Sequence, residues 1–277
     1  GMYMWLSQGI AVLARMGGQV KVAQSLGAGD APLAGRFAQN SLQLGLLLST
    51  IFTLIMLVFN KPLIGFFNLN DPTVVRDART YLVVVSLGIV SSVTLLVFTG
   101  LITATGNSKT PFIATVLGLL LNIVLDPVFI FLLDMGVQGA ALATILSQLL
   151  SAVWAVSFLR GKKALIRLEW GSMRLQPKLV WQIVSLGFSS FVMAITNSIV
   201  QVACNSTLQA FGGDLYVGVM TILNSVREVV STPINGVTSA AQPVMGFNYG
   251  AQEYRRVRSG IVFTTIVCIV YTTAVWL

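Results

Sequence analysis

A carboxylate inside an apolar segment is the group in this chain best placed to do chemistry. The segment Leu121–Phe131 reads L-N-I-V-L-D-P-V-F-I-F and contains Asp126, with Asn122 one helical turn before it. Residues four apart lie on the same face of a helix, so these two side chains are expected to share a site. Pro127 has no N–H to donate to the carbonyl of Ile123, which leaves that oxygen free and predicts a helix kink. One carboxylate and two neutral oxygens could therefore converge on one cation.

The role of Asp126 is open on these grounds. An ionised carboxylate would bind Na⁺ or another cation, whereas desolvation in a membrane favours the neutral form and would make Asp126 a proton carrier. A purely structural role is the third option: Asp126 caps the helix that Pro127 breaks, or it forms an intramembrane hydrogen bond. An ionisable group at such a place is a functional-site hypothesis by default.

Two further groups of polar residues interrupt apolar stretches later in the chain. Arg227 and Glu228 are sequence neighbours and do not face each other on a helix, so each needs its own partner or a wet cavity. Glu228 is a candidate second protonation or cation-attracting site, or half of an ion pair with another helix. Asn197, Gln201 and Asn205 recur at fourfold spacing, which is typical of a cavity lining and equally of hydrogen bonds between helices.

The composition indicates that the segments carrying these polar residues lie in a membrane. Hydrophobic residues make up 55% of the 277-residue chain and charged residues 9%, and the mean hydropathy is +0.84. A soluble domain carries about 25% charged residues. We therefore predict an all-α integral membrane protein.

Eight segments are long enough to span a bilayer, because a spanning helix needs roughly 20 predominantly apolar residues. They cover residues 1–24, 37–60, 80–104, 111–133, 135–159, 179–213, 216–252 and 259–277. The first residue is Gly, and the last residues lie inside an apolar run. We expect a piece of a longer protein, cut at both ends within the membrane domain.

Basic residues predict the orientation, because cytoplasmic loops carry an excess of Lys and Arg. One face of the membrane carries Lys21, Arg36, Lys109, Arg160, Lys162, Lys163, Arg167, Arg174, Lys178, Arg255, Arg256 and Arg258. The other carries Lys61, Arg76 and Arg79. The first face is expected in the cytoplasm, and the net charge of +8 reports topology rather than nucleic-acid binding. Asp126, about 12 Å along the helix from Asp134, would lie nearer the outside.

A basic stretch and an internal repeat predict two lobes. Residues 160–181 are expected to be a cytoplasmic linker between an N-terminal lobe (1–159) and a partial C-terminal lobe (182–277). The sequence L-G-A-G-D at 26–30 recurs as Y-G-A-Q-E at 249–253. An even number of helices between the copies makes the repeats parallel in the membrane, an arrangement of transporters whose substrate cavity lies between the halves.

Four motifs in this order resemble the multidrug and toxic compound extrusion (MATE) transporters. They are L-G-A-G-D, N-x-x-x-D-P at Asn122–Pro127, G-A-A-L-A-T at Gly139–Thr144 and Q-P-V-M-G-F-N-Y-G-A at Gln242–Ala251. The resemblance covers essentially the whole chain. It implies a twelve-helix plan of two six-helix lobes, of which this chain would hold helices two to nine. It also implies Na⁺- or H⁺-coupled export of organic cations and amphipathic drugs by alternating access.

The resemblance implies roles for individual residues. In members whose N-terminal lobe holds the cation, the Asn and Asp of the motif, here Asn122 and Asp126, act with a Thr of the next helix, which matches Thr144. Their partner acid on the first helix would lie outside this chain. Members similar to NorM place a carboxylate in the seventh helix eleven residues after an L-G pair. Here Asn197 stands eleven residues after Leu186, and this departure favours Asp126 as the site.

The expected partners are small cationic or amphipathic molecules and the lipid bilayer. We expect a monomer in a bacterial cytoplasmic membrane, no cofactor, and no metal beyond Na⁺ at Asp126. The chain has no His, which excludes His-based catalysis within it, and we expect no enzyme activity. The alternatives are a flippase or metabolite exporter of related fold, and a non-transporting or channel-like membrane protein.

Overall fold

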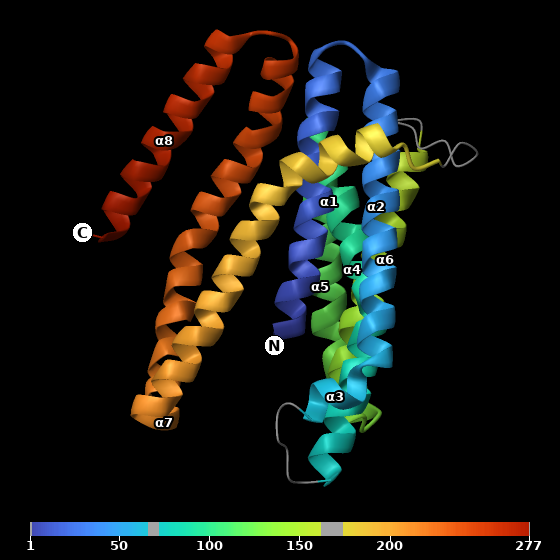
Figure 1. Cartoon of the computed structure of the whole chain (residues 1–277), viewed down its shortest axis with the longest axis vertical. Helices are drawn as coiled ribbons and strands as arrows, with labels where there is room; N and C mark the ends of the chain where they lie inside the picture. The colour runs from blue at the N-terminus through green and yellow to red at the C-terminus, as the bar shows by residue number, and fades with distance from the viewer. Residues whose placement is uncertain (1, 66–71, 162–173, 277) are drawn as a thin grey trace.

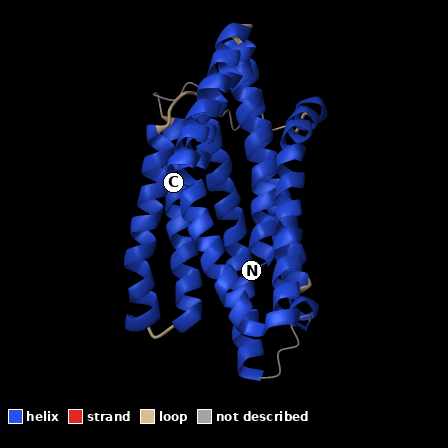
Figure 2. Ribbon diagram, turned by 90° about the vertical axis from the view of Figure 1, so that its left-hand side faces the viewer, coloured by secondary structure: helices blue, strands red, loops and turns tan. Residues whose placement is uncertain are grey.

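The computed structural model describes residues 2–65, 72–161 and 174–276. All regular structure in these ranges is helical (Figure 2). The elements are α1 (Met2–Gly27), α2 (Ala31–Val58), α3 (Asn60–Gly65), α4 (Pro72–Ala104), α5 (Lys109–Pro127), the π-helix η1 (Val128–Leu132), α6 (Gly136–Arg160), α7 (Pro177–Gly250) and α8 (Tyr254–Trp276). This confirms the predicted all-α class.

Helices occupy all eight predicted spans. Six segments of the described ranges are long and apolar enough to cross a membrane: 31–58, 78–104, 109–132, 138–159, 177–213 and 254–276. The other two predicted spans are α1 and the second arm of α7, which are helical but carry more polar residues. The two arms of α7 meet at Gly213, whose backbone is non-helical (φ 61°, ψ −158°). This break falls at the end of the predicted span 179–213, just before the predicted span 216–252.

Several helices begin earlier than the apolar runs predicted. α2 starts at Ala31 rather than 37 because Asp30 caps it, its carboxylate accepting from the N–H of Leu33 at 2.9 Å. α8 starts at Tyr254 rather than 259, with three arginines in its first turns. Charged residues end an apolar run but are tolerated in helical turns at the membrane interface. The sequence Asn70-Asp71-Pro72 also predicts a turn, of which residues 70 and 71 lie outside the described ranges.

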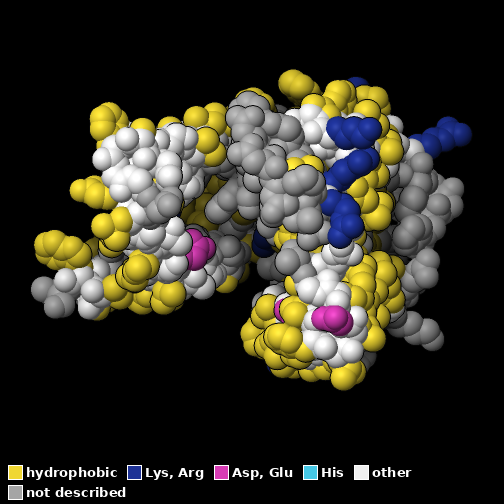
Figure 3. Space-filling model, turned by 90° about the horizontal axis from the view of Figure 1, so that it is seen from below, with side chains coloured by type: hydrophobic (Ala, Val, Ile, Leu, Met, Phe, Trp, Pro, Cys, Tyr) yellow, Lys and Arg dark blue, Asp and Glu magenta, His cyan; other side chains and the backbone are white. Residues whose placement is uncertain are grey.

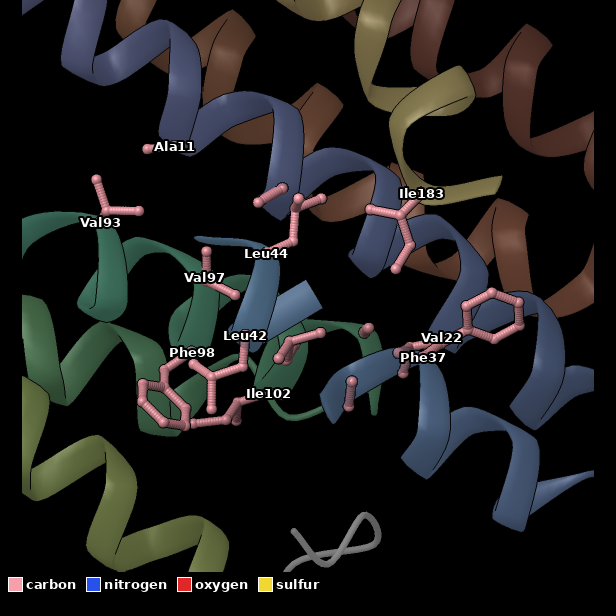
Figure 4. Packing of buried hydrophobic residues seen from close by; sticks show 14 of the residues in the cluster. Ala11, Val22, Phe37, Leu42, Leu44, Val93, Val97, Phe98, Ile102 and Ile183 are labelled. Atoms are coloured by element: carbon pink, nitrogen blue, oxygen red, sulfur yellow. The ribbon is translucent and has the colours of Figure 1, made fainter. Parts of the chain in front are cut away.

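The main hydrophobic core lies between α1, α2 and α4 (Figure 4). Leu42 of α2 and Phe98 and Ile102 of α4 are each 1% exposed. Ile183 of α7 is fully buried in the same cluster. The first arm of α7 therefore packs on the N-terminal bundle. Its first turn, residues 177–181, lies within the predicted linker, and residues 162–173 of that linker are outside the described ranges.

The rest of the second half stands apart from this bundle. In Figure 1 the second arm of α7 and α8 form a hairpin beside the α1–α6 bundle, and among the described elements α8 contacts only α7. Figure 3 shows hydrophobic side chains around much of the perimeter of both halves. The most apolar stretches of α5 and α8 contain no residue that is buried within the protein. The exposed surfaces of these two helices are therefore free to contact lipid or further helices.

The two copies of the sequence repeat adopt the same turn. Gly29 and Gln252, at matching positions, both have left-handed backbones, with φ of 79° and 61°. The N–H of Asp30 donates to the carbonyl of Ser25 at 2.9 Å, and the N–H of Glu253 donates to that of Asn248 at 2.9 Å. One turn design therefore ends both α1 and α7.

These two turns also bring their helices into reciprocal contact. A Cβ added to Gly27 would lie 1.9 Å from the carbonyl oxygen of Phe247, and one added to Gly250 would lie 1.9 Å from that of Gln24. The contact is reciprocal: Gly27 faces Phe247, three residues before Gly250, and Gly250 faces Gln24, three residues before Gly27. Only glycine allows backbones to approach this closely, and the reciprocity gives the contact a local twofold character.

Candidate cation site

The segment around Asp126 changes helix type where the sequence predicts a kink. α5 ends at Pro127 and continues as the π-helix η1, rather than as the single α-helix predicted over 111–133. Pro127 lacks the N–H that an α-helix requires, and the next turn is wider, with the N–H of Leu133 donating to the carbonyl of Val128 at 2.9 Å. Single π-turns of this kind recur at functional sites.

Three of the predicted residues meet across α5 and α6. The side-chain amide of Asn122 donates to Oδ1 of Asp126 at 3.3 Å and to Oγ1 of Thr144 at 3.5 Å. The hydroxyl of Thr144 in turn donates to the carbonyl of Ala140 at 3.0 Å. All three side chains are half-buried. The structure therefore brings Asn122, Asp126 and Thr144 to one place, although they come from two helices.

The arrangement leaves oxygen acceptors close to one another. The amide hydrogens of Asn122 are directed to Asp126 and Thr144, and the hydroxyl hydrogen of Thr144 is directed to Ala140, so the Asn122 oxygen and one Thr144 lone pair remain available. The Asp126 carboxylate adds a negative charge. A carboxylate with neutral oxygens is a ligand set for a hard cation, and the carboxylate alone can carry a proton.

The other predicted residues lie elsewhere. Glu228 is exposed on the second arm of α7 and has no hydrogen-bond or ion-pair partner for its side chain within the described ranges. Asn197 and Asn205 are exposed on the first arm, and Gln201 donates to Asn205 at 3.4 Å along the same helix. Neither group joins the Asp126 site.

Sequence reasoning missed a cavity beside this site. A cavity of about 350 Å³, termed the inner cavity, lies between α4, α5 and α6 and is lined by Asn122, Thr144 and Ser92, among others. The hydroxyl of Ser92 donates to the side-chain oxygen of Gln148 on α6. The three- and four-residue spacing of Thr144, Gln148 and Ser151 was the signal available for the α6 wall.

The fold is that of a helical protein with several membrane-length apolar helices. The family model described as MatE matches residues 2–128 and 189–277. The chain therefore belongs to the MatE family, which comprises multidrug efflux transporters and not enzymes.

Individual relatives agree with this assignment. The "Probable multidrug resistance protein NorM" of Thermotoga maritima is 29% identical over 87% of this chain and 52% of its own length. An "FAD transporter" of Shewanella oneidensis is 23% identical over 97% of this chain and 60% of its own. A solved structure of an outward-facing MATE family transporter of the MOP superfamily superposes with a TM-score of 0.91 at 27% identity, covering 98% of this chain and 60% of that one. The chain thus spans a little over half the length of these relatives.

Proposed function

We propose that this chain forms most of the N-terminal lobe and part of the C-terminal lobe of a cation-coupled antiporter that exports organic cations and amphipathic drugs. The observation that carries the proposal is the meeting of Asn122, Asp126 and Thr144 inside an apolar bundle. Binding of Na⁺ or H⁺ at Asp126 would favour one conformation of the lobes and its loss the other. A cation that prefers one state can drive alternating access by that difference in affinity.

The coupling ion acts through charge balance at Asp126. Empty and ionised, the site holds a negative charge in a half-buried position, which is costly in a membrane. Na⁺ or H⁺ would neutralise it, with the Asn122 and Thr144 oxygens completing the shell of Na⁺. Glu228, exposed on α7, is proposed as a second cation-attracting group in the other lobe, and Asn197, Gln201 and Asn205 as lining residues of the drug cavity.

A metabolite exporter is the second candidate function. The Shewanella oneidensis relative is an FAD transporter, so proteins similar to this chain are not confined to drugs. We propose that the protein acts as a monomer in a bacterial cytoplasmic membrane, with the basic loops in the cytoplasm. The excess of Lys and Arg at one end of the helices supports this orientation.

Efflux from proteoliposomes tests the proposal. Vesicles containing the whole protein are loaded with ethidium, a Na⁺ or a pH gradient is imposed, and efflux is followed. Asp126→Asn is expected to abolish gradient-driven efflux because the variant cannot hold either ion as the carboxylate does. Asp134→Asn is the matched control, because Asp134 is an exposed carboxylate at the end of the same helical segment.

The two gradients identify the ion and separate the candidate functions. Efflux driven by Na⁺ at constant pH assigns Na⁺, and efflux driven by pH without Na⁺ assigns H⁺. Ethidium efflux that is independent of both gradients would indicate a channel. Ethidium retention combined with gradient-driven export of a flavin nucleotide would favour the metabolite exporter. Native efflux by Asp126→Asn would contradict the proposed site.

A further inference from the structure

The inner cavity runs from the candidate cation site toward one membrane face. Its wall on α5 extends from Asn122 to Ala114, and its wall on α6 extends from Thr144 to Ser151. Eight and seven residues separate the ends of these walls, or about 12 Å and about 10 Å of helix. Both walls run toward the helix ends that adjoin basic loops, the ends predicted to be cytoplasmic.

A second cavity lies on the opposite side of the site. This outer cavity, of about 90 Å³, is enclosed by α1, α4 and α6, and its α4 wall extends from Tyr81 to Ser92. It reaches the half of α4 that leads to the predicted outer face. A buried water needs roughly 10–15 Å³, so both cavities have room for water.

The two cavities meet at three side chains. Ser92, Thr144 and Gln148 line both of them. The hydrogen bond from Ser92 to Gln148 joins α4 to α6 at this level, and Thr144 is the residue that Asn122 contacts. The contact between Ser92 and Gln148 thus lies where the outer cavity adjoins the inner cavity.

The hydroxyl groups of the inner cavity present mostly acceptors to it. Five of its six hydroxyl groups donate their hydrogen to a backbone carbonyl of their own helix; they belong to Thr99, Thr115, Thr144, Ser147 and Ser151. The sixth hydroxyl, that of Ser92, donates to Gln148. A hydroxyl whose hydrogen is engaged offers only lone pairs to the cavity. No residue that lines this cavity is charged. Such a wall attracts a hydrated cation weakly enough to release it, as conduction requires.

We propose that the coupling cation leaves the Asp126 site through the inner cavity, and that the contact between Ser92 and Gln148 closes this route from the outer cavity. The inference rests on the proposed antiport function and specifies the path of its ion. Because the wall is uncharged and most of its hydroxyls present lone pairs, it would accept Na⁺ or protonated water chains more readily than anions. Closure at Ser92 would prevent the ion gradient from dissipating when no drug is carried.

Cysteine labelling tests the route without requiring transport. In the whole protein with Cys204 and Cys268 replaced by Ser, Ser151→Cys is expected to react several-fold faster with a cationic than with an anionic methanethiosulfonate. It is expected to react only from the side of the basic loops. Ser157→Cys is the control, since Ser157 is exposed on the same helix and donates to the carbonyl of Val153 in the same way, and no charge preference is expected there.

Ion leak tests the closure. Ser92→Ala is expected to increase drug-independent dissipation of the coupling gradient several-fold, and Ser92→Thr, which keeps the hydroxyl, is expected to keep the leak low. Ser198→Ala on α7 removes a comparable hydroxyl away from both cavities and should have no effect. Gln148→Ala provides the same test from the other partner if Ser92→Ala does not fold.

The outcomes separate this inference from the proposed function. Native efflux together with a Ser151→Cys that reacts without charge preference, or from the opposite side, would overturn the exit route alone. An unchanged leak in both Ser92→Ala and Gln148→Ala would overturn the closure. Charge-selective labelling of Ser151→Cys without gradient-driven efflux in the native protein would contradict the antiporter and support the cation-accepting cavity.

Discussion

The Asp126 carboxylate accepts few hydrogen bonds for a carboxylate in an apolar helix. Among the described residues its one hydrogen-bond donor is the amide of Asn122 at 3.3 Å. An ionised carboxylate has about four lone-pair sites, so most of its capacity is unused in this conformation. A residue that served only to hold two helices together would be expected to use more of that capacity.

Replacement of Thr144 by Val tests whether its oxygen binds the ion. The change keeps the shape and removes the lone pairs. We expect a loss of about 1 kcal/mol of cation binding, or roughly a fivefold increase in the Na⁺ or H⁺ concentration that half-activates efflux. Thr207→Val is the control, because Thr207 is exposed on α7 and makes the same bond, to the carbonyl of Ala203. Equal activation curves for native protein and Thr144→Val would exclude Thr144 from the ion shell.

The left-handed backbone of Gln252 predicts a stabilising substitution. The left-handed conformation costs a non-glycine residue roughly 1–2 kcal/mol, which glycine avoids. Glycine also makes the unfolded chain more flexible, and this offsets about 0.5–1 kcal/mol of the stabilisation. Gln252→Gly is therefore expected to raise the free energy of unfolding by about 0.5–1 kcal/mol. Gly29→Ala, at the matching position (φ 79°), should lower it. Thermal unfolding in detergent measures both, and a lower midpoint for Gln252→Gly would contradict the argument.

At this scale the sequence reveals contacts within one helix better than contacts between helices. The proximity of Asn122 and Asp126 could be predicted from the sequence, because residues four apart lie on one face of a helix. Thr144 came only from the family resemblance, since nothing in the local sequence locates it beside Asn122. The bond from Ser92 to Gln148 joins residues 56 positions apart and depends on how α4 and α6 pack.

Among the elements, apolar runs locate helices well and their ends poorly. The runs identify the bilayer-facing middle of each helix, whereas the ends are decided by caps such as Asp30. The π-helix η1 could not be predicted. Pro127 indicates that the α-helical hydrogen-bond pattern is interrupted, but it does not indicate which backbone conformation follows. The adjoining helix contributes to that choice: a Cβ on Gly139 of α6 would lie 2.7 Å from the carbonyl oxygen of Phe129 in η1.

This contact makes Gly139 a test of the π-helix. Gly139→Ala would force η1 and α6 apart, and overpacking of this kind costs about 1–3 kcal/mol. We expect a lower unfolding midpoint and weaker activation of efflux by the cation, because η1 begins two residues after Asp126. In Gly218→Ala the new methyl group meets open space, and alanine is the better helix former, so that variant should be neutral or slightly stabilised. A native response from Gly139→Ala would show that η1 does not position the site.

Over the whole molecule, the reciprocal contact of the two turns holds the halves together at one end. Gly27→Val would place side-chain atoms where the carbonyl of Phe247 lies, so the ends of α1 and α7 are expected to separate. Spin labels at Ala28→Cys and Glu253→Cys, both exposed positions, would report a longer distance than in the protein with Gly27. Gly236→Val is the control, as nothing lies within 4 Å of that position. An unchanged label distance would show that the contact does not set the spacing of the halves.

The packing of α1 on α7 also has a consequence for the order in which the protein matures. The helices lie side by side, yet 150 residues separate the end of α1 at Gly27 from the start of α7 at Pro177. At about 5–20 residues per second, translation of that interval takes roughly 8–30 s. During this time the face of α1 that later meets Ile183 faces lipid or the insertion machinery. Correct maturation therefore requires α1 to avoid aggregation until the first arm of α7 has been inserted.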